Sequence, residues 1–172
     1  TSMFPCWSET FILNEIVSHQ QSGFNLTIIS LKKCSDKIIQ ENANKLIKNT
    51  VYVGSFFSFK IIVKHIKLLN NNPEIYFKSL FEIIRLTPVF SIVKFKSLAV
   101  FFVCPIFIDS IRTNMIDHIH AHFATFPALL AKIIYNFTGI PYSFTAHAHD
   151  IYIDRTLLSL LAQEAKFIAT IS

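Results

Sequence analysis

Glycine, cysteine and long apolar runs are all scarce in this chain. Three glycines in 172 residues leave no phosphate-binding loop of the G-x-G-x-x-G kind. Cys6, Cys34 and Cys104 lie far apart, which excludes a C-x-x-C zinc or redox pair and is typical of a reducing compartment. The most apolar uncharged stretch, 97–108, contains a proline and is shorter than the roughly 20 residues of a transmembrane helix. We therefore expect 97–108 to form a buried helix or one that lies against lipid.

Charge is also scarce, and it is unevenly distributed. Hydrophobic residues make up 52% of the chain and charged residues 16%, which suggests faces that another domain or a membrane surface covers. Seven bases stand against two acids between Lys60 and Lys96, so this segment accounts for the whole net charge of +5. It is either a solvated helix face or a surface for anionic lipid headgroups or a phosphorylated acceptor. Nucleic acid is not expected, because the bases alternate with aliphatic residues at helical spacing.

Helix and strand patterns alternate along the sequence. The first helix is predicted at 8–23, with Ser8 as its N-cap and Glu9 in its first turn. A helical tract at 58–115 is predicted to be interrupted at Pro73 and Pro88. Further helices are predicted at 36–48, 127–139 and 155–165, and strands at 24–31, 50–54, 117–124, 140–147 and 166–172. This alternation predicts a single α/β domain, residues 1–172, with helices around a parallel sheet.

The two ends of the sequence do not fit a complete sheet. Only "TSM" precedes the first helix, and the sequence ends on a strand pattern. We therefore expect a piece of a longer protein that lacks most of its first strand.

Five of the seven histidines fall in two short clusters. "DHIHAHFA" (117–124) holds three, and "PYSFTAHAHDIY" (141–152) holds two beside an aspartate. Both clusters follow strand patterns, and ligands of open parallel sheets bind at the carboxyl ends of strands. Alternation places His118, His120 and His122 on one face of their strand, with Ile119, Ala121 and Phe123 on the other.

Three interpretations of the clusters remain open from the residues alone. A zinc site could use His118, His120 and His122 together with His147 and His149, as in a zinc-dependent hydrolase, but neither cluster contains a cysteine. Alternatively, the histidines are neutral members of the sheet, hydrogen-bonded to the backbone. The third interpretation is a polar site for a sugar or phosphate, which imidazoles suit because they change charge near neutral pH.

Four strings, in this order, closely resemble the N-terminal half of family 4 retaining glycosyltransferases. They are "FPCWSETFILNEI" (4–16), "HIHAHFAT" (118–125), "GIPYSFTAHAHDIY" (139–152) and "AKFIATIS" (165–172). The nearest resemblance is to enzymes of colanic acid and exopolysaccharide synthesis. Residues 55–115 share only the general character of the corresponding helical tract, without matching strings. The resemblance implies a GT-B fold, in which this chain is the acceptor-side Rossmann-like domain and a nucleotide-sugar domain follows it.

The resemblance also implies roles for individual residues. His147 is expected to hold hydroxyls of the donor sugar near the reacting carbon, and Asp150 to contact an acceptor or sugar hydroxyl; these are the expected catalytic residues. His149 takes a position where similar enzymes often carry a base. His120, His122 and His149, together with Ser8, Glu9 and Thr10 of the first loop, are expected to bind substrate.

The implied activity is transfer of a hexose from a nucleotide-diphospho-sugar to a saccharide or lipid-linked acceptor, with retention of configuration. No catalytic metal or other cofactor is expected. The groups that stabilise the leaving phosphate would lie in the C-terminal domain, so we expect the 172-residue chain alone not to turn over. A binding module without catalysis is the other alternative. We expect a cytoplasmic protein, with residues 60–96 offering contact to an anionic surface on the cytoplasmic face of the inner membrane.

Overall fold

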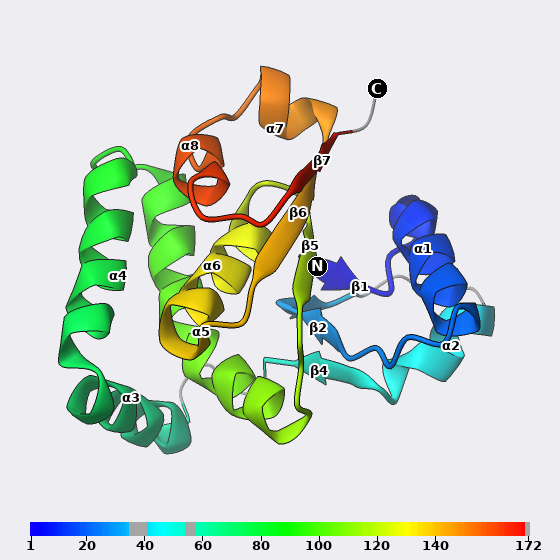
Figure 1. Ribbon diagram of the computed structural model, residues 1–172. Coiled ribbons are helices and arrows are strands. Elements are labelled where there is room, and N and C mark those ends of the chain that lie inside the picture. The colour runs from blue at the N-terminus through cyan, green and yellow to red at the C-terminus, as the bar shows by residue number, and fades with distance from the viewer. Residues whose placement is uncertain (35–40, 54–57, 171–172) are drawn as a thin grey trace. The chain divides into compact units, whose positions relative to one another are not determined.

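A computed structural model describes residues 1–34, 41–53 and 58–170. These residues form two compact units, Thr1–Val53 and Gly54–Ser172, and each is described by itself. Both units combine helices with short parallel strands, as the sequence predicts for an α/β protein (Figure 1). The Rossmann-like and GT-B assignments are finer than this observation and remain predictions.

The N-terminal unit holds two pairs of parallel strands. Strand β1 (Met3–Phe4) pairs with β3 (Lys32–Lys33), and β2 (Ile28–Ser30) pairs with β4 (Thr50–Tyr52). The helical turn η1 (Trp7–Glu9) leads into α1 (Thr10–Gln21), and α2 (Glu41–Ile47) precedes β4. Phe4, Leu13, Ile28, Ala43 and Leu46 form the core of this unit.

The first helix begins later than the sequence predicts. Ser8 lies inside η1, with its hydroxyl 3.2 Å from the Cys6 sulfur, and α1 has Glu9 at its N-cap position without a side-chain cap. Ser8 is therefore not the N-cap. The helix ends just before Gly23, whose φ of +87° lies in the left-handed region that glycine adopts without strain. The predicted helix at 36–48 is confirmed from Glu41 to Ile47; residues 36–40 lie outside the described residues.

The C-terminal unit contains the helical tract that the sequence predicts. Helices α3 (Phe59–Asn71), α4 (Pro73–Leu86) and α5 (Ile92–Thr113) follow one another. Pro73 begins α4, where its missing N–H has no helical partner to lose, and Pro88 follows the end of that helix. The apolar stretch 97–108 lies in α5, and most of its side chains are buried in this unit. It is thus a buried helix, and no helix of the described residues is long and apolar enough to cross a membrane.

Three parallel strands in the order β5-β6-β7 form the sheet of this unit. They are β5 (Ile119–His122), β6 (Tyr142–Ala146) and β7 (Ile168–Thr170). Helix α6 (Phe126–Thr138) connects β5 to β6, and α7 (Ala148–Tyr152) and α8 (Leu158–Ala162) connect β6 to β7. Gly139 ends α6 with φ +74°, as predicted, and its N–H bonds to Tyr135. Helix α7 was not predicted.

The core of the C-terminal unit lies where α5 and α6 pack together and α6 packs on the sheet. Phe107, Ile133 and Phe144 are among its fully buried side chains. Lys132 is also buried, and its ammonium forms ion pairs with Glu164 and, at 3.6 Å, with Glu82. Two carboxylates therefore compensate this charge inside an apolar helix layer.

Candidate functional site

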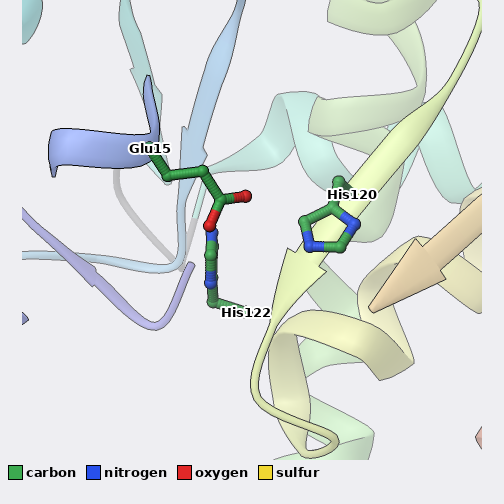
Figure 2. A group of neighbouring side chains, drawn as sticks. All are labelled: Glu15, His120 and His122. Carbon is green, nitrogen blue, oxygen red and sulfur yellow. The ribbon is translucent and has the colours of Figure 1, made fainter. Parts of the chain in front are cut away.

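The register of β5 and β6 brings the histidine clusters together. His120 stands beside Ser143 and His122 beside Thr145. Because side chains alternate along a strand, this face of the sheet carries a set of polar side chains from both strands. Figure 2 shows the rings of His120 and His122 projecting from β5.

A continuous row of hydrogen bonds runs across this face. Ser143 Oγ lies 2.7 Å from His118 Nε2 and 2.8 Å from His120 Nδ1. The second nitrogen of His120 lies 3.0 Å from Thr145 Oγ1. A serine hydroxyl has one proton, so when it donates to one ring it accepts from the other. The protonation patterns of His118 and His120 are therefore coupled through Ser143.

One interpretation was that His118 and His120 are residues of the sheet that hydrogen-bond to the backbone. These contacts correct it. Their partners are side-chain hydroxyls of the neighbouring strand. The expectation that the two rings share a face is confirmed, since both reach the same serine. Burial, and to a lesser extent the positive charge of Lys166, lower the pKa of His118 below its ordinary value. This shift favours the neutral form of the His118 ring.

An aromatic ring covers one end of the row. Phe167, which precedes β7, stacks on His118 with centroids 5.8 Å apart and on His120 at 6.0 Å. About half of the Phe167 surface, 53%, stays exposed. The row thus ends in an apolar ring that is accessible to a ligand.

The other end of the row gathers His122, His147 and Phe123. The rings of His120 and His122 lie 5.3 Å apart, and those of His122 and His147 lie 6.3 Å apart. Phe123 stacks on His147 with centroids 4.2 Å apart. His122 of the first cluster and His147 of the second are therefore neighbours.

Phe123 lies on the side of the histidines, contrary to the prediction from alternation. Its φ is +74°, in the left-handed region, so the chain leaves the extended conformation directly after His122. Its N–H still bonds to the Thr145 carbonyl at 2.9 Å. The turn redirects the phenyl ring onto the imidazole of His147, and such backbone outliers are frequent at binding sites.

Asp150 holds the two strand ends together. It is buried, and its Oδ2 accepts hydrogen bonds from the main-chain N–H of Ala124 at 2.8 Å and of His147 at 3.0 Å. The second bond is the carboxylate half of a capping box at the start of α7. The loop after β5 and the residue after β6 are thus fixed by one carboxylate. In this position Asp150 orients the backbone of His147; contact with a sugar hydroxyl stays a prediction.

The remaining expected site residues are not members of this row of hydrogen bonds. His149 is exposed on α7. Ser8, Glu9 and Thr10 are consecutive in the N-terminal unit, at the junction of η1 and α1. Burial raises the pKa of the Glu9 carboxyl above its ordinary value.

The imidazoles are also possible metal ligands. Ring nitrogens of His120 and His122 lie within 4.8 Å of each other, close enough to share an ion. Both nitrogens of His120, however, already face hydroxyl groups at hydrogen-bonding distance. Metal binding at this pair would have to replace at least one of these bonds.

Sequence reasoning missed Ser143, Thr145 and Phe167. A signal for the two hydroxyls was present, because Ser143 and Thr145 alternate with Tyr142, Phe144 and Ala146 in an otherwise apolar strand. Phe167 had no such signal, since its contact with the histidines depends on the order of the strands in the sheet.

Comparison of the chain with protein-family models, with curated proteins and with solved structures finds no match.

Proposed function

We propose that this chain is the acceptor-side part of a retaining glycosyltransferase, which transfers a hexose from a nucleotide-diphospho-sugar to a saccharide or lipid-linked acceptor. One observation carries the proposal. Three of the four strings with family resemblance supply the adjacent strands β5, β6 and β7. Their side chains meet on a single sheet face and at its carboxyl edge, where open parallel sheets bind ligands.

The chemistry of this face suits a sugar. Imidazole and hydroxyl groups both donate and accept hydrogen bonds, which is what a polyhydroxy ligand requires. The exposed ring of Phe167 offers an apolar face at one end, and Phe123 stacks at the other. A few convergent polar groups beside aromatic surface are typical of small-molecule sites.

His147 and His122 are the residues that we assign to the reacting end of the sugar. Asp150 fixes the main chain of His147, and Phe123 restrains its ring. A preorganised imidazole of this kind can bond to sugar hydroxyls without first losing side-chain freedom. Retention requires the new glycosidic bond to form on the face of the anomeric carbon from which the phosphate leaves, so the donor must be held in one orientation.

The activity test uses the complete gene product that carries these residues. Release of nucleoside diphosphate from UDP-, GDP- and TDP-hexoses is measured with a bacterial lipid extract as the source of acceptor. We expect turnover, and we expect His147→Ala to lower kcat/KM by about 100-fold or more, as loss of a group that contacts the transition state does. His19→Ala is the matched control, because His19 is exposed on α1 in the N-terminal unit.

Full activity of the His147→Ala enzyme would contradict the proposed site. Hydrolysis that is lost on chelation and restored by Zn²⁺ would instead favour the zinc hydrolase. Binding to the 172-residue chain is measured separately, by NMR of the imidazole signals during titration with the same sugar nucleotides and with oligosaccharides. Signals of His120, His122 and His147 should shift, while that of His19 should not.

A further inference from the structure

Helix α3 turns an apolar stripe away from the core. Its buried side chains include Ile61 and Leu68, which face the rest of the C-terminal unit. The opposite side carries apolar residues at the spacing i, i+3, i+4, i+7, with exposures from 48% to 75%: Phe59, Ile62, Val63 and Ile66. Such a stripe normally packs inward. In this helix both sides are apolar, and only one is covered.

Helix α4 repeats the arrangement. Ser79 and Ile83 are buried, whereas Phe77, Phe81 and Ile84 form an exposed stripe at i, i+4, i+7. Helices α3 and α4 both pack on α5, and Figure 1 shows them as the layer of this unit that is farthest from its sheet. Their covered sides face α5, so their exposed stripes face outward.

The connection between α4 and α5 is the most exposed apolar part of this layer. Val89 is 73% exposed and Phe90 is 90% exposed, with Ile92 and Phe95 following on the first turns of α5. Phe90 has φ +60°, a backbone conformation that aromatic residues rarely adopt. This conformation costs free energy, and the phenyl ring at the turn stays in contact with solvent.

We call these residues the outer apolar surface: Phe59, Ile62, Val63, Ile66, Phe77, Phe81, Ile84, Leu86, Val89, Phe90, Ile92 and Phe95. Monomeric soluble proteins rarely expose so many large apolar side chains on neighbouring elements. A partner that buries apolar surface is therefore expected here.

The charges around this surface identify the partner. Exposed cations lie along the same helices: Lys60, Lys67, Lys78, Arg85 and Lys96. Glu74 is an exposed acid there, whereas Glu82 is half-buried with its carboxylate 3.6 Å from Lys132. On α3 the apolar stripe is central, with Lys60 and Lys67 at one edge of the exposed face. This is the arrangement of an interfacial helix with a basic margin.

From the outer apolar surface and its cations we infer that this face docks on an anionic lipid bilayer. The phenyl and aliphatic side chains enter the boundary between headgroups and acyl chains, and the bases contact lipid phosphates. A second copy of the chain is disfavoured as the occupant, because the same face on both copies would bring cations against cations. The inference depends on this surface alone and is independent of the proposed function.

Flotation of the full 172-residue chain with vesicles tests the inference. Vesicles of phosphatidylcholine alone are compared with vesicles that also contain about 30 mol% of the anionic lipid phosphatidylglycerol. We expect flotation with the anionic vesicles, weak or no flotation with the neutral ones, and loss of binding when salt is raised to about 0.5 M.

Two sets of variants separate the apolar and the electrostatic contributions. Phe77→Gln with Phe81→Gln should lower the partition coefficient by at least about tenfold, because two exposed rings no longer enter the lipid. Lys78→Gln with Arg85→Gln should lower it by about 20- to 30-fold, at about fivefold for each base near an anionic surface. Met115→Gln and Lys33→Gln are the matched controls, since both residues are exposed outside this surface, and they should bind as the wild type does.

Each other outcome overturns the inference. Equal flotation with neutral and anionic vesicles, no flotation at all, or binding that survives both sets of variants would exclude an anionic lipid as the occupant. Sedimentation without lipid covers the remaining occupant: a dimer that the Phe77 and Phe81 variants dissociate would identify a second copy. Thermal unfolding of each variant is recorded, and the charge variants test the inference even if the apolar variants fold poorly.

Discussion

On strands β5 and β6, the rings of His118 and His120 share one serine hydroxyl, whereas on helices α3 and α4 Ile66 and Phe81 are more than half exposed. Both regions belong to the C-terminal unit. The sheet face places polar groups where strands normally carry apolar ones, and the helices place apolar groups where water would favour polar ones. The sheet face is thus more polar than is usual for a strand, and the outer helices are more apolar than is usual for a surface helix.

The two regions differ in whether their side chains find partners within the unit. On the sheet face, hydroxyls and imidazoles bond to one another, so the row is already ordered before a ligand arrives. On the outer helices, covering the apolar side chains requires a separate partner. A preorganised polar face favours recognition of a specific small molecule, and an exposed apolar and cationic face favours a surface of low chemical specificity.

The largest expected effect is on the free energy of unfolding, when a buried phenylalanine and an exposed one are each replaced by alanine. Phe107 has no exposed surface, whereas Phe81 is 62% exposed. We expect Phe107→Ala to lower the free energy of unfolding by about 3 to 5 kcal/mol, because it removes buried apolar area and leaves a cavity. The same change at Phe81 should alter it by no more than about 0.5 kcal/mol.

Urea unfolding followed by circular dichroism measures both values. If Phe81→Ala lowered the free energy of unfolding as much as Phe107→Ala does, the outer apolar surface would have to be buried in solution, and it would no longer differ from the core. Repeating the measurement over a range of protein concentrations would then show whether self-association buries it.

The start of α4 and the end of α6 could be predicted from local chemistry, whereas the helix predicted at 155–165 is limited to Leu158–Ala162. Which side of a helix faces the core could not be predicted. Pro73 and Gly139 act through their own backbone properties, so the start of α4 and the end of α6 followed from the sequence. The spacing of Ile62 and Ile66 indicates one side of a helix, but it does not say whether that side meets the core. Burial of Ile61 and Leu68, on the other side of α3, decided this, and such burial is a tertiary effect.

The candidate site divides in the same way. Strand alternation predicted that His118 and His120 share a face, because the period of a strand is a local property. It failed at Phe123, where a left-handed turn ends the strand, and nothing in the residue type indicates such a turn. Helix α7 was missed because five residues are too few to show a period, and its cap depends on the spacing of His147 and Asp150.

A smaller effect on the free energy of unfolding is expected when Asp150, whose carboxylate joins the strand ends, is replaced. Asp150→Ala leaves the N–H groups of Ala124 and His147 without their acceptor, so we expect a loss of about 2 to 3 kcal/mol in the free energy of unfolding. Asp154 is the matched control: it is only partly buried, and its carboxylate accepts hydrogen bonds from the nearby Thr156, including one from the main-chain N–H at 3.1 Å. Asp154→Ala should cost about 1 kcal/mol or less.

Asp150→Asn sharpens the comparison further, because it retains an oxygen acceptor while removing the charge. We expect it to unfold between Asp150→Ala and the wild type in the same urea experiment. If Asp150→Ala were no more costly than Asp154→Ala, the carboxylate would not hold the sheet edge together, and the ordering of His147 would need another cause.

The smallest expected effect concerns the protonation of His118. Burial and Lys166 lower its pKa in the folded protein, so its NMR titration midpoint should fall below the ordinary histidine value of about 6.5. The unfolded chain then binds the proton more readily, so the stabilisation is complete above about pH 6.5 and is lost as the pH falls toward the folded pKa. His118→Gln identifies the signal and should make the free energy of unfolding less sensitive to acid in this range. Lys166→Gln should raise the midpoint, because it removes the smaller of the two causes. A His118 midpoint at or above 6.5 would show that burial and Lys166 do not favour its neutral ring, and the proton pattern described for the hydrogen bonds to Ser143 would then need revision.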